Sequence, residues 1–349
     1  MSLLFIEGFD NLNEIYWDDA YQGMKWDLTD YGSDFYVLDT GWLGSGYAAK
    51  FLDANSYSGG YSRSIPDSNT IIIGMALKYS YYPIIACDYA AKLFRLRRGS
   101  ENQLYVQQVS TGHLQVVRGD GTVLGTTTNV IPSGMWFYLE LKATITSSGG
   151  SFELRIDGAT ECSGSGLDTA SLGTDGVNTI AIAVHGSGVF HWWYDDIYCC
   201  NSSGSVNNDF LGGNKVHLVA ADGEGYSEQW TRSTGTHNYE CIRETVADTA
   251  SYVSSYTDSQ IDSYTFANLS YTPSAIRGVQ LAAFAKRSSV QDRNFLMFAR
   301  VNSTNYEGDQ QALAYDWKCP TQMVETNPNT GTVWTKATLD GAEFGIKVT

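Results

Sequence analysis

The stretch His191-Trp192-Trp193-Tyr194-Asp195-Asp196-Ile197-Tyr198-Cys199-Cys200-Asn201 decides how the rest of the chain is interpreted. Aromatic, β-branched and other apolar residues dominate it, and a Ser/Gly-rich segment (202–205) follows, so the pattern predicts a strand that runs into a flexible break. We expect this strand to close a β domain beside the opening strand Leu3–Asp10. The chain is therefore predicted to hold two domains, residues 1–202 and 203–349.

The composition favours an all-β protein. The chain has 349 residues, enough for two domains that each bury a core. It contains 35 Gly and 23 Tyr but only 6 Pro, and helix-forming periodic stretches are few. The formal net charge of −16 argues against nucleic acid or an anionic membrane as the partner, because both reward basic surfaces.

Two patterns in the first half predict antiparallel strands. From Trp136 to Thr146 the side chains alternate, with apolar residues from Phe137 to Ile145 on one face and polar ones such as Glu140 on the other. A Gly149-Gly150 turn precedes a second alternating strand, so we expect a hairpin with one face in water. The segment Thr70–Tyr79 is apolar on both faces and is expected at the centre of a sheet.

Three of these segments together resemble the laminin-G/concanavalin-A-like jelly roll: FIEGFDN (5–11), WFYLELKATITSSGGSFELRIDG (136–158) and WWYDDIYCCN (192–201). The order of a Trp-led strand, a Gly-Gly turn, an Asp-Gly end and a final Asp-Asp strand carries the resemblance. It covers roughly residues 1–202. The implied fold is a jelly-roll sandwich followed by a second β-sandwich domain.

The second half resembles the C-terminal part of virion proteins of tailed bacteriophages, through ADGEGYSEQWT (221–231), NPNTGTVWT (327–335) and AEFGIKV (342–348). That resemblance implies a structural component of the virion, either a capsid decoration or a tail or tail-fibre protein, with host-surface glycans as a further partner to be tested. The implied partners are other virion proteins and further copies of the chain.

The start of the chain shows no basic segment before an apolar run, so no signal peptide is expected. No apolar run approaches the length of a membrane helix, and no membrane insertion is expected. Both observations suit a protein made in the host cytoplasm and assembled into a virion.

Glycan hydrolysis on a jelly roll needs two carboxylates close together. The glucanases of this fold place them as Glu-x-Asp-x-Glu, a spacing that keeps all three side chains on one strand face. The segment Glu153-Leu154-Arg155-Ile156-Asp157 has the period but puts Arg155 in the middle. We therefore predict that the chain is not an enzyme. Two alternatives stay open: a free, lectin-like carbohydrate-binding protein, and a degenerate glycan hydrolase.

A metal site is predicted at Asp195 and Asp196, or at Asp18 and Asp19, because adjacent carboxylates suit Ca²⁺. The alternative is that these carboxylates accept backbone N–H bonds where strands cross. No other cofactor is expected.

A carbohydrate-binding platform is predicted from aromatic residues near glycines and Pro83. Flat aromatic faces with a few polar groups suit sugar rings. The alternative is that these side chains pack between sheets or in subunit contacts. The predicted residues are Trp42, Tyr47, Tyr79, Tyr81 and Tyr82.

Two further patterns are interpreted as structural. The segment Asn327–Trp334 has the rhythm of a sialidase Asp-box, which is a braced turn and not a catalytic element. The five His residues are scattered, and no His/Asp/Ser or Cys/His arrangement is recognisable in the sequence.

Overall fold

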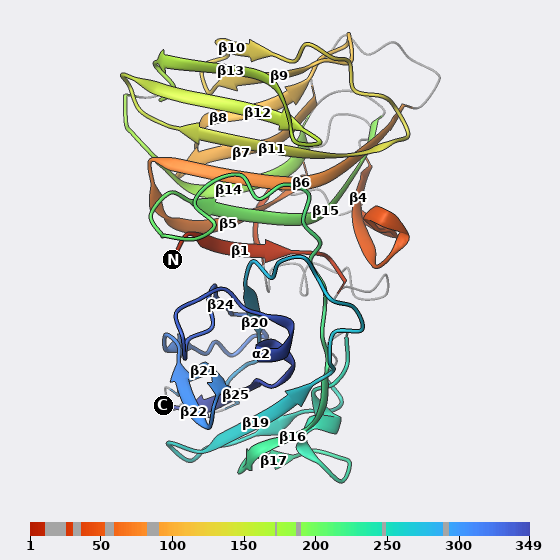
Figure 1. Cartoon of the computed structure of the whole chain (residues 1–349), viewed down its shortest axis with the longest axis vertical. Helices are drawn as coiled ribbons and strands as arrows, with labels where there is room; N and C mark the ends of the chain where they lie inside the picture. Colours follow the sequence, from red (N-terminus) through yellow and green to blue (C-terminus); the bar gives the residue numbers. More distant parts are fainter. Residues whose placement is uncertain are drawn as a thin grey trace. The chain divides into compact units, whose positions relative to one another are not determined.

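A computed structural model of the chain describes residues 1–10, 26–30, 36–52, 59–81, 91–171, 173–185, 190–245, 249–288 and 293–349. Among these residues the chain separates into two compact units, the first ending at Val216 and the second beginning at His217. The fold is almost entirely β (Figure 1). In the described residues, no helix is both long enough and apolar enough to span a lipid bilayer.

The first unit is made of strands that pair antiparallel. They are β1 (Leu3–Glu7), β2 (Asp27–Asp30), β3 (Tyr36–Thr40), β4 (Tyr47–Leu52), β5 (Gly59–Ser68), β6 (Thr70–Tyr81), β7 (Ala91–Arg98), β8 (Glu101–Gln108), β9 (Leu114–Arg118), β10 (Val123–Thr126), β11 (Trp136–Thr144), β12 (Gly150–Ile156), β13 (Ala159–Leu167), β14 (Val177–His185) and β15 (Phe190–Asn201).

In the described part of the first unit these strands form two sheets. The eight-stranded sheet has the order β13-β12-β11-β6-β15-β4-β3, with β1 also paired to β15. The seven-stranded sheet has the order β10-β9-β8-β7-β14-β5-β2. The predicted meeting of the first and last strands is confirmed, because Leu3 lies opposite Cys200. The predicted jelly-roll sandwich is confirmed as well.

The core of the first unit lies between the two sheets. The central position predicted for residues 70–79 is confirmed, since β6 lies between β11 and β15 and its residues from Ile71 to Leu77 are buried on both faces. Aromatic side chains fill the space, as where Phe51 packs edge-on against Tyr194. The Tyr194 hydroxyl crosses to the other sheet and donates to the Leu93 carbonyl at 2.9 Å. Burying such rings is the main stabilising contribution to a sandwich of this kind.

The prediction that one face of the 136–156 hairpin lies in water is wrong for two residues. Tyr138 and Glu140 are 2% and 1% exposed. The cause is the segment after β15, whose Gly212 N–H donates to Glu140 Oε1 at 2.8 Å. This segment was assigned to the second domain from sequence, but residues up to Val216 pack with the first unit.

The second unit is also built from β-strands. Its described residues form a six-stranded sheet of order β16-β19-β25-β21-β22, with β23 on β21, and two two-stranded sheets, β17-β18 and β20-β24. The strands are β16 (Ala221–Glu228), β17 (Thr231–Arg232), β18 (Val253–Ser254), β19 (Ile261–Phe266), β20 (Val279–Ala282), β21 (Asn294–Val301), β22 (Thr304–Glu307), β23 (Gln311–Ala312), β24 (Thr321–Val324) and β25 (Glu343–Val348); the helix α2 is Lys336–Asp340.

Trp334 lies in the core of this second unit. It is 2% exposed and packs with Val301 and Phe344. The turn that precedes it is braced as predicted: the Asn327 side chain accepts the Asn329 N–H at 2.9 Å, and Trp334 Nε1 donates to a backbone carbonyl. The segment Asn327–Trp334 therefore serves as a structural turn.

Candidate functional site

The acidic pair predicted from sequence lies at an irregular point of β15. The pairing of β15 with β6 shifts between Asp195 and Tyr198, and Asp196 has a positive φ of 47°. In a regular strand two neighbouring side chains would point to opposite faces. A bulge of this kind re-aims a side chain, and here both carboxylates are buried at 2% exposure.

A tight loop between β3 and β4 reaches the acidic pair. The Trp42 N–H, at the start of the short 3-10 helix η2 (Trp42–Gly44), donates to Asp195 Oδ2 at 2.7 Å. At the other end of the loop the Tyr47 N–H donates to Asp10 Oδ1 at 2.8 Å. Only glycine fits at Gly46, where φ is +73° and a Cβ would overlap the Asp10 carboxylate. We call Asp10, the loop Gly41–Tyr47, Asp195 and Asp196 the acidic loop site.

The charges at this site are not balanced by the side chains around it. Burial, followed by the charge of Asp196, raises the pKa of Asp195 above its ordinary value. Burial raises the pKa of Asp196 too, while the Val216 N–H and the Lys215 charge act to lower it. The Lys215 ammonium donates to the Ser45 carbonyl of the loop at 3.1 Å. The charge of Lys215 thus acts on Asp196, while the charge of Asp10 acts to raise the pKa of both Asp195 and Asp196.

One observation favours a Ca²⁺ ion beside Asp195 and Asp196. Both Asp195 oxygens accept backbone N–H groups, from Trp42 and from Asp196 at 2.7 Å, as the non-metal alternative predicts. Asp196 Oδ2, by contrast, is buried and has no hydrogen-bond partner among the described residues, which is costly unless a proton or a cation compensates it. Asp195 and Asp196 would offer carboxylate oxygens to the ion, which Ca²⁺ prefers, although no three carboxylates of the described residues at this site bring ligand atoms within 4.8 Å of one another. The other predicted pair, Asp18 and Asp19, lies outside the described residues.

The predicted aromatic platform is divided by the structure. Trp42 and Tyr47 belong to the acidic loop site; Tyr47 is 49% exposed, and Trp42 is half-buried with its ring 5.1 Å from that of Tyr138. Tyr79 is a correction. It is 7% exposed, stacks on Trp192 at 5.1 Å and donates to a backbone carbonyl, because its position on β6 faces the core.

The structure gives no side-chain position for the two remaining platform residues, Tyr81 and Tyr82. Tyr82 lies outside the described residues, as does the side chain of Tyr81. The platform as predicted is therefore reduced to Trp42 and Tyr47, and both owe their position to backbone hydrogen bonds with Asp195 and Asp10.

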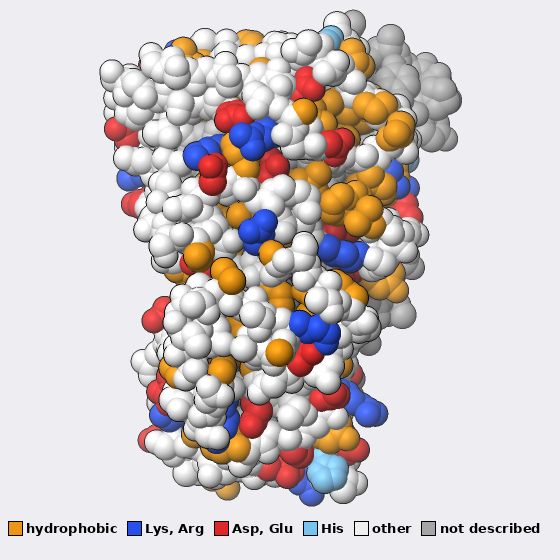
Figure 2. Space-filling model, viewed as in Figure 1, with side chains coloured by type: hydrophobic (Ala, Val, Ile, Leu, Met, Phe, Trp, Pro, Cys, Tyr) orange, Lys and Arg blue, Asp and Glu red, His pale blue; other side chains and the backbone are white. Residues whose placement is uncertain are grey.

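A second feature was missed in the sequence because its residues come from four strands. Trp136 of β11 lies opposite Lys78 of β6, Lys78 opposite Trp193 of β15, and Trp193 opposite Lys50 of β4. We call these four residues the Trp–Lys row. The row crosses the outer face of the eight-stranded sheet, since its neighbours Leu77 and Trp192 face the core. Figure 2 shows hydrophobic side chains gathered in patches on the first unit, beside Lys and Arg.

Cations and rings alternate along this row. The Lys78 Nζ lies 4.9 Å from the Trp136 ring centroid and 4.3 Å from that of Trp193, and the Lys50 Nζ lies 4.8 Å from Trp193. These separations lie within the range of cation–π attraction. Trp193 is fixed from the side by Asp39, whose Oδ2 accepts its Nε1–H at 2.8 Å. The lysines and Trp136 stay partly exposed.

The acidic loop site and the Trp–Lys row lie next to each other. Asp195 is two residues beyond Trp193 on β15, a separation of about 7 Å along an extended strand. Lys50 and Tyr47 share β4. The same end of the sheet therefore presents a buried acidic centre beside partly exposed cations and indoles.

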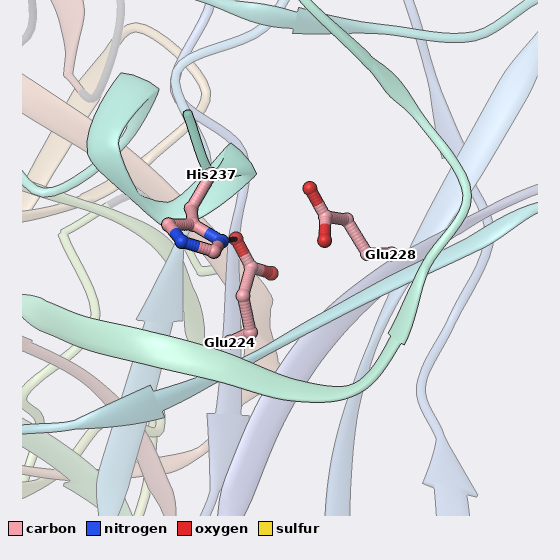
Figure 3. Close-up of side chains that lie close together, drawn as sticks. All are labelled: Glu224, Glu228 and His237. Carbon is pink, nitrogen blue, oxygen red and sulfur yellow. Dashed lines mark ion pairs between the residues drawn. The ribbon is translucent and has the colours of Figure 1, made fainter. Parts of the chain in front are cut away.

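One group of possible metal ligands lies in the second unit (Figure 3). Glu224, Glu228 and His237 bring one ligand atom each within 4.8 Å of one another, and no other three His, Cys, Asp or Glu side chains of the described residues do so. Existing contacts account for this group: His237 Nδ1 lies 3.9 Å from Glu224, and Arg232 pairs with Glu228 at 3.3 Å. Sequence inspection missed it because His237 meets β16 only through the fold.

Comparison with known proteins finds likeness in structure only. No family model and no curated protein matches the chain. Among solved structures, alginate lyase Aly36B matches with a TM-score of 0.38 and 9% identity, covering 50% of this chain and 86% of the lyase. A structure of botulinum neurotoxin type C, titled for its dependence on two ganglioside molecules, matches with a TM-score of 0.41 and 9% identity over 100% of this chain and 98% of the toxin chain.

A third match is Trypanosoma rangeli sialidase in complex with sialic acid, with a TM-score of 0.38 and 12% identity over 57% of this chain and 30% of the sialidase. At such low identities and scores these matches show no more than β folds of the same general kind. None of them indicates a phage origin.

The matches do overturn the prediction that the chain is not an enzyme. Alginate lyases and a sialidase are enzymes among the matched structures. The missing Glu-x-Asp-x-Glu triplet therefore excludes one kind of active site and not catalysis in general. Catalysis by this chain is not established by the matches either.

Proposed function

We propose that the first unit binds carbohydrate on the outer face of its eight-stranded sheet, at the Trp–Lys row. One observation carries the proposal: two indoles and two ammonium groups share a single row across four strands and stay accessible at Trp136, Lys78 and Lys50. Sugar-binding faces combine flat aromatic surface with a few polar groups in this way.

The acidic loop site supports the same proposal. It holds the loop that carries Trp42 and Tyr47 beside the row, through Asp195 and Asp10. With Ca²⁺ bound at the pair, the loop would be held in place with the charge of the buried aspartates compensated. Ca²⁺ would thus act on the shape of the binding face.

The test is a glycan array followed by titration of the best ligand into wild type and two variants. Trp136→Ala should weaken binding at least about fivefold, because indole contacts contribute about 1 kcal/mol or more. Tyr256→Ala is the matched control, since Tyr256 is an aromatic residue of the second unit and is 85% exposed. A wild-type protein that binds no glycan, or equal losses in both variants, contradicts the proposal.

The biological setting is proposed from the sequence resemblance alone. We propose that the chain is a virion component of a tailed phage, as a capsid decoration or part of a tail or fibre, and that it assembles with other virion proteins and with itself. Mass spectrometry of purified particles, together with sedimentation of the isolated protein, tests this setting. Absence from the particles would refute it and leave a free glycan-binding protein.

A further inference from the structure

We propose that the saccharide bound at the Trp–Lys row is acidic, and that Lys50 and Lys78 together bind a sugar-ring carboxylate, as in a uronic acid. The inference rests on the proposed function, because it names the class of glycan for the same face.

The first reason is the charge balance at the row. Both ammonium groups lie within 5 Å of the centroid of one indole, Trp193. Neither forms an ion pair within 4.0 Å with a carboxylate of the described residues, although the charge of Asp39 acts on both, and both lie over aromatic rings. Two like charges on the strands either side of Trp193 repel each other, and an anion that contacts both would relieve the repulsion.

The second reason is that the nearby carboxylate is already committed. Asp39 accepts the Trp193 Nε1–H at 2.8 Å with one oxygen and the Thr40 N–H at 2.7 Å with the other. Burial acts to raise the pKa of Asp39, but these two hydrogen bonds and the charges of Lys78 and Lys50 outweigh it and lower that pKa. Asp39 thus stays ionised and orients Trp193, leaving the row with a net positive charge.

The third reason is that burial destabilises the charged form of Lys78. Burial lowers the pKa of Lys78; the charge of Asp39 acts to raise it, the smaller effect of Lys50 acts to lower it, and burial prevails. A bound carboxylate would act in the opposite direction. The rings also fix the two lysines before a ligand arrives, which reduces the side-chain entropy lost on binding.

The fourth reason is one of size. The two ammonium groups can lie no further apart than about 9 Å, given their distances to the shared ring. A carboxylate that accepts one charge-assisted bond on each side, at about 2.8 Å each, spans up to about 8 Å between nitrogens. A single uronate carboxylate can therefore contact both ammonium groups at any separation up to about 8 Å, with the sugar ring against Trp136.

The fifth reason is that the Trp–Lys row differs in charge from the rest of the protein surface. The whole chain carries a formal charge of −16, so most of its surface repels an acidic polysaccharide. A site with two cations and one committed carboxylate is then distinct from its surroundings. At the opposite end of the same sheet face, Lys142 is already paired with a carboxylate, that of Asp209 at 2.9 Å.

The experiment compares a tetrasaccharide of galacturonic acid with its methyl ester by calorimetry on the full chain. The ester replaces each charged carboxylate with a neutral methyl ester and leaves the sugar backbone unchanged. We expect the acid to bind at least about fivefold more tightly than the ester, and the difference to shrink as salt is raised. Equal affinity for acid and ester overturns the inference, while the proposed function stands.

Variants then locate the anion. Lys50→Gln and Lys78→Gln should each weaken binding of the acid about two- to fivefold and leave the ester unchanged. Lys142→Gln is the matched control on the same sheet face and should change neither. Asp39→Asn keeps an acceptor for Trp193 but removes a competing charge, so binding of the acid should tighten.

Three further results would count against the proposal. Equal losses in Lys142→Gln and Lys50→Gln would show a diffuse charge effect and overturn the assigned contact. Binding of a sulfated, carboxylate-free galactan in place of the uronate would refute the assignment of a carboxylate as the recognised group. Failure of the folded wild-type protein to bind the acid or the ester would overturn the inference, and failure to bind any glycan on the array would remove the proposed function as well.

Discussion

The buried pair Asp195 and Asp196 should make the protein lose stability as pH rises when no Ca²⁺ is present. Both carboxylates have a raised pKa in the folded state, Asp195 because of burial and the neighbouring charge and Asp196 chiefly because of burial. Above about pH 4 the unfolded chain has released protons that the folded protein still holds, so unfolding becomes easier as pH increases. This stability is present at low pH and is lost as pH rises through the folded-state pKa values.

The size of the effect follows from linkage. Each proton that only the folded state retains changes the free energy of unfolding by about 1.4 kcal/mol per pH unit. One retained proton between about pH 5 and 8 therefore corresponds to about 4 kcal/mol, a large part of the stability of an ordinary domain. His191 acts in the opposite direction below about pH 6.5, because burial lowers its pKa, but it is common to all variants compared.

The assay is urea unfolding of wild type, Asp195→Asn and Asp196→Asn in a chelator, at several pH values. Each variant should match wild type near pH 5 and be more stable near pH 8, because it carries one buried charge fewer. Ca²⁺ should stabilise the wild type at pH 8, by about 2.7 kcal/mol at a hundredfold excess over its Kd, and should have little effect on Asp196→Asn. Asp39→Asn is the control, since the pKa of Asp39 is lowered and its contribution is lost only in acid.

A variant that keeps the full wild-type slope would refute this account of the pair. A Ca²⁺ response that survives in Asp196→Asn would place the ion elsewhere, since the unpartnered oxygen at this site belongs to Asp196.

Three other substitutions test the structure. Tyr79→Phe removes a buried bond of 2.7 Å to the Ile131 carbonyl and should lower the free energy of unfolding by about 1 kcal/mol without changing glycan binding; a loss of binding would return Tyr79 to the surface platform. Gly46→Ala adds a Cβ at a φ of +73° that overlaps Asp10, so it should cost about 1–3 kcal/mol in urea unfolding and weaken any Ca²⁺ response, whereas a neutral result would contradict the loop geometry. Trp334→Ala should destabilise the second unit by about 3–5 kcal/mol in thermal or urea unfolding, and a cost below about 1 kcal/mol would show that this residue is not part of its core.

Much of the first unit was predictable because its patterns are local. The alternation in residues 136–156 predicts the β11–β12 hairpin, and the predominantly apolar residues on both faces of 70–79 predict a central strand. Hydrophobic periodicity depends only on which faces of a strand are buried, and it is clear in both segments.

The same reasoning fails where a distant segment covers a face. Glu140 alternates like a solvated residue, yet it is buried because Gly212 and Tyr198 bond to it. Tyr79 looks like a surface aromatic beside Pro83, yet the period of β6 turns it to the core. In both cases the residue type occurs on surfaces and in cores, and the contacts made in the tertiary structure determine whether it is buried.

The sequence by itself determined that the chain is all-β, that a strand containing Asp195 and Asp196 pairs with the opening strand, and that this acidic pair needs compensation. Only the tertiary structure decided that a bulge buries both carboxylates beside the loop of Trp42. It also decided that Trp193 and Lys78 come together. The physical reason is that strand register is set by side-chain packing between segments far apart in the chain, so residues meet across strands without any spacing along the sequence that would reveal it.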